Sequence, residues 1–349
     1  MNGTIYDFSG LPRLAALGPD ALAWPPRERV RAPAPAGSRV GLIRNPRSHR
    51  NASLTDADRH PRPGVVAAAP RSRAELRDVL GQFARSRIDL LVIDGGDGTV
   101  RDVLTCAEDV WGARWPRIAV LPSGKTNALA IDLGLPHDWT LDQALAAARD
   151  GRVASRAPVE IERRDGLGQP VRGFLVGAGG FVAATELAQR AHRAGAFNGV
   201  GVGLALSWAI AQTFFGPADG RWRRGERMRL RYHPRSVPMH AAPLAADRAH
   251  YLLLASTLER MPLGLKPFGK PRPGMKTLSI DAPPRRMLTA PATLLSGAEP
   301  AWLDRAGYHR VDAPSLDVDL EGSFILDGEV FPGGSYRISE GSPLSFVIP

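Results

Sequence analysis

The sequence is poor in cysteine and in long apolar runs. Cys106 is the only cysteine, which excludes an internal disulfide framework and is typical of a reducing compartment. Its neighbours form an apolar helix face, so we expect it in the core rather than as a nucleophile. No uninterrupted apolar run reaches the length of about 18 residues that a spanning helix needs. The nearest candidate, residues 199–216, is broken by glycines and polar residues. We therefore expect no signal peptide, no spanning helix and a cytoplasmic location.

Lysine is also scarce, although the chain is strongly basic. Only four of its 45 basic residues are lysines, and 35 acidic residues leave a net charge of +10. Such a balance favours anionic partners, such as phosphate-rich ligands or an acidic membrane surface, although arginine-rich composition alone also produces it. No basic-aromatic recognition motif accompanies the charge, so we expect no nucleic-acid partner. The eight histidines show no metal-ligand spacing, which argues against a zinc site.

The pattern of apolar residues predicts an arm and two domains. Residues 1–37 are rich in Pro, Ala and Arg and have no sustained period, so we expect a loosely ordered N-terminal arm. In residues 38–155 short apolar strands alternate with amphipathic helices, which predicts an α/β domain with a parallel sheet. Residues 156–349 contain many short strands and one strong helical region at 182–215. This pattern predicts a β-rich, mostly antiparallel sandwich or barrel.

Three loops of the first domain directly follow predicted strands, at residues 44–50, 94–99 and 122–127. Ligands of parallel sheets bind beyond the carboxyl ends of the strands, so these loops are expected to line one crevice. The most specific of them is GGDGT, from Gly95 to Thr99. Its glycines let the backbone approach a phosphate, and the helix that follows adds its positive end. Asp97 in an anion site suggests Mg²⁺ between carboxylate and phosphate. A tight turn with Asp97 as helix N-cap is the structural alternative.

The stretch LPSGKTNALA at residues 121–130 contains the Gly-Lys-Thr ending of a P-loop. In a true P-loop the strand stops before a long cradle of backbone N–H groups. Here the predicted strand, Ile118–Leu121, runs through the would-be cradle, and Pro122 removes one N–H. Only four residues remain free to turn, which is too short to wrap a triphosphate. We therefore expect a short phosphate-contacting loop and not a P-loop.

Together these motifs resemble the diacylglycerol kinase catalytic-domain family, whose relatives include sphingosine and ceramide kinases. The family pattern N-P-x-S-G is represented in the first loop, GGDGT in the second, and P-x-G-T-x-N-D-F-A in the third. Later motifs are a glycine-phenylalanine strand end at residues 177–181 and D-G-E at 327–329. The matching residues outside GGDGT are Asn45, Pro46, Ser48, Pro122, Gly124, Asn127, Ala130, Gly177, Phe181, Asp327, Gly328 and Glu329.

The resemblance implies a nucleotide domain followed by a β-rich domain, with ATP and lipid meeting in the cleft, and transfer of the γ-phosphoryl group to a lipid hydroxyl. Asp97 would act through Mg²⁺, Asp327 would be the general base, and Glu329 would orient it or assist the metal. Read without the family, Asp327-Gly328 is a hairpin turn. The residues implied to bind the nucleotide are Asn45, Ser48, Gly95, Gly96, Asp97, Gly98, Thr99, Gly124, Lys125, Thr126 and Asn127.

Several positions depart from the family pattern. His49, Lys125 and Ala128 replace its glycine, threonine and aspartate, and Lys125 either contacts phosphates as a point charge or is solvated. The acidic metal motif of bacterial members is missing from residues 270–280. Three basic residues stand there instead and are candidates to occupy the place of the metal. They are Lys270, Arg272 and Lys276.

The lipid side is expected to involve an anionic membrane surface on the inner face of the membrane. Arg227, Arg229 and Arg231 alternate with apolar residues and occupy one face of a predicted strand, after Trp222, Arg223 and Arg224. A solvated strand face is equally compatible with this pattern. Residues 199–216 are either a core helix or an acyl-chain entrance.

The leading hypothesis is an ATP-dependent kinase of a diacylglycerol-like, ceramide-like or sphingoid-type lipid. A catalytically impaired lipid- or nucleotide-binding protein is the alternative suggested by Lys125 and Ala128. An NAD kinase would share GGDGT, but its second signature segment is missing. The choice of lipid, and whether the protein forms a homodimer, stay open.

Overall fold

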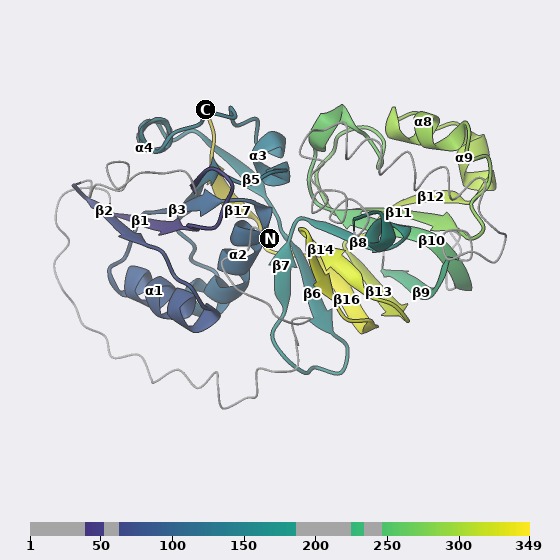
Figure 1. Cartoon of the computed structure of the whole chain (residues 1–349), viewed down its shortest axis with the longest axis horizontal. Helices are drawn as coiled ribbons and strands as arrows, with labels where there is room; N and C mark the ends of the chain where they lie inside the picture. Colours follow the sequence, from purple (N-terminus) through teal and green to yellow (C-terminus); the bar gives the residue numbers. More distant parts are fainter. Residues whose placement is uncertain (1–38, 52–62, 186–224, 234–245) are drawn as a thin grey trace. The chain divides into compact units, whose positions relative to one another are not determined.

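The computed structural model describes residues 39–51, 63–185, 225–233 and 246–349 (Figure 1). The chain divides into two compact units. Of the described residues, the first unit contains those up to Pro158 together with Gly166–Gly173 and Ser342–Pro349. The second contains Val159–Asp165 and the residues from Phe174 to Gly341. The predicted arm at 1–37, the apolar stretch 199–216, most of the helix at 182–215 and Trp222 to Arg224 lie outside the described residues.

The first unit is built on a sheet in the order β2-β1-β3-β4-β17-β5. All neighbouring pairs are parallel except β17 with β5. Strands β3 and β4 are almost wholly buried, as a central parallel strand should be, because helices cover both faces. The strands are β1 Val40–Arg44, β2 Val65–Ala68, β3 Leu90–Gly95, β4 Arg117–Pro122, β5 Val153–Arg156 and β17 Leu344–Val347. The predicted parallel-sheet domain is confirmed.

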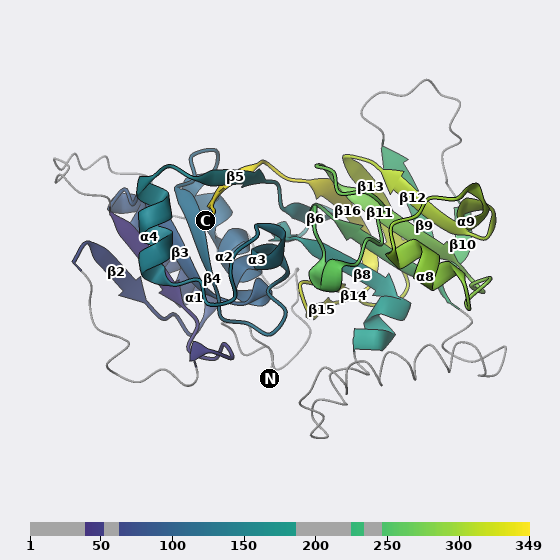
Figure 2. The same cartoon turned by 90° about the horizontal axis from the view of Figure 1, so that it is seen from above.

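Helices α1 (Arg73–Arg85) and α2 (Asp97–Trp111) cover one face of this sheet, and α3 (Ala128–Asp132) and α4 (Leu141–Arg149) cover the other (Figures 1 and 2). Both expected N-caps are present. Ser72 accepts a hydrogen bond from the Glu75 N–H, although the Glu75 carboxylate binds the Arg71 N–H rather than completing a capping box. Thr140 and Gln143 form the full reciprocal box at α4.

The last strand of the chain departs from the sequence-based division at residue 155. Residues 344–348 were expected in the β-rich domain, yet β17 inserts between β4 and β5 in the first unit. Strand β7 (Val171–Gly173) also lies beyond residue 155 yet belongs to the first unit, where the Arg172 N–H donates to Oγ1 of Thr105 in α2. Alternating apolar residues predict a strand, but they do not specify which sheet it joins, because pairing partners are far apart in sequence.

The second unit is dominated by an antiparallel sheet, as expected. Its main path runs β15-β14-β8-β10-β9-β13-β16-β6, and β10 also pairs with β11, which pairs with β12. The strands are β6 Val159–Arg163, β8 Leu175–Gly179, β9 Glu226–His233, β10 Ala246–Ser256, β11 Lys276–Asp281, β12 Tyr308–Asp312, β13 Ser315–Leu320, β14 Phe324–Leu326, β15 Glu329–Phe331 and β16 Gly334–Glu340.

Two short helices, α8 (Ala290–Leu295) and α9 (Ala301–Arg305), pack on β11 and β12 around a core that includes Leu278 and Leu294 (Figure 1). The sequence did not predict them, because helices of six and five residues are too short to display a period. No helix among the described residues is long and apolar enough to cross a bilayer.

Candidate functional site

The first predicted loop is held at the carboxyl end of β1 by Asn45, which is fully buried. Its side-chain amide donates to Oγ1 of Thr99 at 2.9 Å, and its Oδ1 accepts the Arg47 N–H. The Ser48 hydroxyl donates to the Asn45 carbonyl at 2.9 Å. These bonds connect the first loop to GGDGT, so Asn45 and Ser48 shape the loop as well as standing in the predicted nucleotide site.

Asp94, at the end of β3, connects the same loops and was not singled out from the sequence. Its buried carboxylate accepts from the Ser123 hydroxyl at 2.5 Å, from the Asn51 amide at 2.9 Å and from Nε of Arg44 at 2.9 Å. One carboxylate therefore ties together the residues that follow β1 and β4. Its position directly before GGDGT was the available signal, but its three partners come from distant segments.

The second and third loops touch through their glycines. A Cβ on Gly124 would lie 2.5 Å from the Cα of Gly96, and one on Gly96 would lie 2.9 Å from the Cα of Gly124. The Ser123 N–H also donates to the Gly95 carbonyl at 3.1 Å. At Gly95 itself a Cβ would run into the Thr99 side chain. Glycine is thus required at both positions for the close backbone approach by which GGDGT and LPSGKTNALA touch.

Asp97 has a structural partner that the sequence did not indicate. Its carboxylate accepts the N–H of Ala128 at 2.9 Å and of Leu129 at 3.2 Å, so it caps the first turn of α3 rather than its own helix. Burial raises the pKa of Asp97, and the backbone hydrogen bonds oppose that rise. A contact of Asp97 with Mg²⁺ stays a prediction, and any such contact would share the carboxylate with α3.

The third loop is a closed turn around Asn127. Its Oδ1 accepts the Gly124 N–H at 2.9 Å, its amide donates to the Gly124 carbonyl at 2.8 Å, and its backbone is left-handed, with φ 51°. Lys125 and Thr126, at the tip, are exposed. Pro122 is part of β4, which confirms that no P-loop cradle precedes the lysine.

The first unit therefore brings all of its predicted nucleotide residues to the carboxyl edge of three neighbouring parallel strands, β1, β3 and β4. Gly96 stands at the N-cap of α2, where no side chain caps the helix. An uncapped helix N-terminus beside exposed Lys125 and Thr126 is suited to an anion such as phosphate.

The D-G-E motif lies in the second unit. Asp327 and Gly328 form the two-residue turn between β14 and β15, with φ 46° and 83°, so the hairpin reading is confirmed. The turn also has a specific anchor. The Asp327 carboxylate accepts the N–H groups of Phe174 and Leu175, at 3.0 and 2.9 Å, where β8 begins. Glu329 is buried. The Asp327 carboxylate is thus held in a defined position, as a positioned proton acceptor requires.

The arginines of β9 are balanced by aspartates. Arg229 and Arg231 lie directly opposite Asp319 and Asp317 of β13. The Arg229 guanidinium is 3.6 Å from the Asp319 carboxylate, while Asp317 is bonded to Arg337 at 2.7 Å. This face carries interleaved charges, which favours the solvated-face interpretation.

Residues 270–276 hold a buried cation instead of carboxylates. The Lys276 ammonium is almost completely enclosed and donates to the carbonyls of Gly274 at 2.7 Å, Arg272 at 2.9 Å and Thr257 at 3.4 Å. Arg272 forms a bidentate pair with Asp312, both bonds 2.6 Å. No cluster of three metal-ligating side chains occurs in the part of the chain that the structure describes.

The fold and the site define a class of protein. It has an α/β unit whose loops after three parallel strands are suited to bind a phosphate, and a second unit with an antiparallel sheet. Comparison with known proteins narrows this class. Residues 39–159 match the family model of the diacylglycerol kinase catalytic domain. The chain therefore carries a diacylglycerol kinase-like catalytic domain, which confirms the resemblance drawn from the motifs.

Solved structures share the fold over both units. One is described as a diacylglycerol kinase from Bacillus anthracis str. Sterne, with TM-score 0.56 and 13% identity, over 89% of this chain and 97% of that chain. Two others, described as candidate diacylglycerol kinases from the same organism, have TM-scores of 0.60 and 0.59 and identities of 16% and 15%, with the same coverage. No curated protein sequence matches the chain significantly.

Proposed function

We propose that the protein is an ATP-dependent lipid kinase. It would transfer the γ-phosphoryl group to the hydroxyl of a diacylglycerol-like or ceramide/sphingoid-type lipid, with Mg²⁺, at the inner face of the membrane. The observation that carries this proposal is the contact of two loops through Gly96 and Gly124, beside the uncapped start of α2, within a domain that matches the kinase family. Lys125 and Thr126 face solvent there and would meet the phosphates.

Few protein groups in this chain could bind the Mg²⁺ of Mg²⁺–ATP directly. Mg²⁺ commonly uses one or two carboxylates together with substrate phosphate oxygens, and Asp97 is the carboxylate of the glycine loops. Its two oxygens already accept amides of α3. In this proposal Asp97 therefore acts mainly by fixing α3 against GGDGT, and the metal would be held chiefly by the nucleotide.

Asp327 is the proposed general base. It would accept the hydroxyl proton while the lipid oxygen bonds to the γ-phosphorus and ADP leaves. Its carboxylate is oriented by the N–H groups of Phe174 and Leu175, and the left-handed backbone of Asp327 is one that aspartate tolerates. A general base contributes on the order of 10²- to 10⁴-fold to the rate. Glu329 would assist from the adjoining strand.

The decisive experiment offers diacylglycerol, ceramide, sphingoid base and monoacylglycerol together with labelled ATP and Mg²⁺, and identifies the product by mass. We expect one phosphorylated lipid, and a large loss of product on Asp97→Asn. Asp109→Asn, on the exposed side of the same helix, is the matched control and should keep activity. A folded protein that yields no phospholipid from the panel would contradict the proposal. Nucleotide binding without turnover would indicate the impaired alternative, and phosphorylated NAD would indicate an NAD kinase.

A further inference from the structure

The segment between β10 and β11 presents leucines to solvent from a well-anchored turn. We call residues 261–268 the leucine turn. Met261 packs against the core of α8 and α9, and Phe268 is part of that core. Between these anchors lies a short 3₁₀ turn, Pro262–Gly264, in which Leu263 is 92% exposed, and Leu265, which follows it, is 39% exposed. Leu263 is the most exposed large apolar residue in the described part of the chain.

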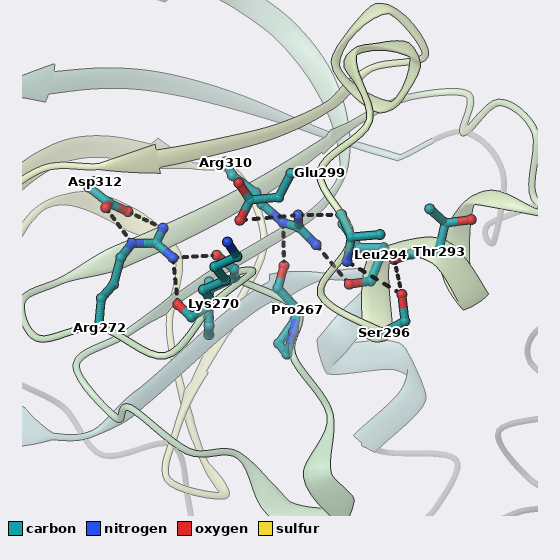
Figure 3. Close-up of polar contacts among 11 residues, drawn as sticks. Pro267, Lys270, Arg272, Thr293, Leu294, Ser296, Glu299, Arg310 and Asp312 are labelled. Carbon is teal, nitrogen blue, oxygen red and sulfur yellow. Dashed lines mark hydrogen bonds and ion pairs between the residues drawn. The ribbon is translucent and has the colours of Figure 1, made fainter.

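The leucine turn is fastened to α8, so its exposure is a built-in feature. The Lys266 N–H donates to the Leu295 carbonyl at 2.9 Å. All three nitrogens of the Arg310 guanidinium, on β12, bind backbone carbonyls of the leucine turn or of α8 and the residues after it. Arg310 donates to the carbonyls of Pro267 at 2.8 Å, Leu294 at 2.7 Å and Ala298 at 2.8 Å (Figure 3). Leu295, at the end of α8, is exposed beside the turn.

The backbone of Leu263 shows that this exposure is costly. Its φ of 59° and ψ of 16° are left-handed, a conformation that costs a leucine roughly 1–2 kcal/mol. Leu263 recovers none of this cost by packing, because its side chain is in solvent. The isolated protein would be more stable with asparagine or glycine at this position. The leucine is therefore an advantage only where its side chain is buried against a partner.

The charged residues around the leucine turn indicate an anionic partner. Residues 260–270 and 283–297 contain five exposed basic residues and no Asp or Glu, and the basic residues are Arg260, Lys266, Lys270, Arg285 and Arg286. Glu299, Asp304 and Asp312 line a pocket of about 630 Å³ next to the turn, together with Arg272 and Arg310. Arg272 is bonded to Asp312 and Asp304 to His309. The excess charge at the turn is positive, unlike that of the β9 face.

We propose that the leucine turn docks the protein on an anionic phospholipid surface. Leu263, Leu265 and Leu295 would enter the boundary between headgroups and acyl chains, and Lys266 and Lys270 would keep their ammonium groups at the phosphates. A two-fold contact between copies of this chain would instead bring two basic patches together, which is unfavourable. The inference holds whichever alcohol the protein phosphorylates, because it concerns attachment and not the reaction.

Vesicle flotation without nucleotide tests the proposal. We expect binding to vesicles of phosphatidylserine and phosphatidylcholine in equal parts, and little binding to phosphatidylcholine alone. Leu263→Asn, which suits the left-handed backbone, should weaken binding at least about tenfold, since burial of one leucine is worth about 1.5–3 kcal/mol. Lys266→Gln should weaken it about fivefold at low salt, from about 1 kcal/mol per charge. Leu167→Ser, an exposed leucine of the first unit, and Arg227→Gln of β9 are the matched controls and should bind like the wild type.

A fluorescent label at residue 263 tests directly whether the leucine turn enters the membrane. Cys106 is buried, so a Leu263→Cys variant can be labelled selectively with an environment-sensitive dye. Its emission should shift to the blue on anionic vesicles, whereas the same dye on Leu167→Cys should not shift. No shift at residue 263, or equal binding of wild type and Leu263→Asn, would overturn the proposal. A change in oligomeric mass on Leu263→Asn without vesicles would also overturn it, because the leucines would then join two copies. Phosphorylation of a soluble short-chain substrate, measured in parallel, separates this outcome from failure of the kinase proposal.

Discussion

The contact between Gly96 and Gly124 makes a sharp prediction for Gly124→Ala. The added methyl group would lie 2.5 Å from the Cα of Gly96 and 2.9 Å from Oδ1 of Asn127. Carbon atoms pack at about 3.5–4.0 Å, so the two loops must separate by roughly 1 Å. Overpacking of this kind typically costs about 1–3 kcal/mol of unfolding free energy. Nucleotide binding should fall further, by at least about tenfold, because both loops contact the phosphates in the proposed site.

The assay is titration of a fluorescent ATP analogue, together with urea unfolding of the same samples. Gly151→Ala is the control, because Gly151 is also in the first unit, has φ 74°, and an added methyl group there would have no atom within 4 Å. It should lose about 1 kcal/mol from backbone strain and keep nucleotide affinity. If Gly124→Ala bound ATP like the wild type, the two glycine loops would not share a phosphate site, and the central geometric argument would fail.

Three further changes test other parts of the molecule. Lys125→Thr should keep most kinase activity, because threonine is the residue of the family pattern at this exposed loop tip and the lysine only adds a charge near the phosphates; a loss of about a hundredfold would make that charge essential. Asp327→Asn should reduce kcat at least about a hundredfold while still accepting an amide of β8; full activity in steady-state assays would leave Asp327 as a turn anchor only. Arg337 lowers the pKa of Asp317 to about 2, so their pair should stabilise the fold above about pH 4 and lose this effect as the pH falls toward 2. Arg337→Ala should therefore cost on the order of 1 kcal/mol in urea unfolding at pH 7, where partial exposure screens the pair, and the difference should shrink in acid.

The sequence predicted the first unit well because its signals are local. Ser72 and Thr140 identify helix starts through side chains three residues from their partners, and β3 is apolar on both faces. The glycine loops were recognisable for the same reason, since Gly-Gly directly after a buried strand lets the backbone approach another group closely. The rejection of a P-loop followed from the predicted strand Ile118–Leu121 and from Pro122 after it, and in the structure the strand β4 extends through Pro122 itself.

What the sequence could not predict depends on partners that are distant in the chain. Asp97 caps α3, which begins 31 residues later. Asp94 gathers side chains that belong to the loops after β1 and β4. The arginines of β9 resemble a free basic face in the sequence, but the fold sets Asp317 and Asp319 of β13 opposite them. In each case the residue type was informative, while its role was set by partners that only the fold brings close.

The reason for a strained backbone differs between the predicted site motifs and the leucine turn. The non-glycine residues with positive φ among those described are Arg87, Asn127, Leu263, Arg286 and Asp327. Asn127 and Asp327 are of the types that adopt this conformation most readily, and each offsets the cost by accepting backbone N–H groups with its side chain. Their strain is therefore part of a rigid site that holds the motif in place. Leu263 has neither the suitable side chain nor a buried contact, so its cost is offset only if its side chain leaves water on binding.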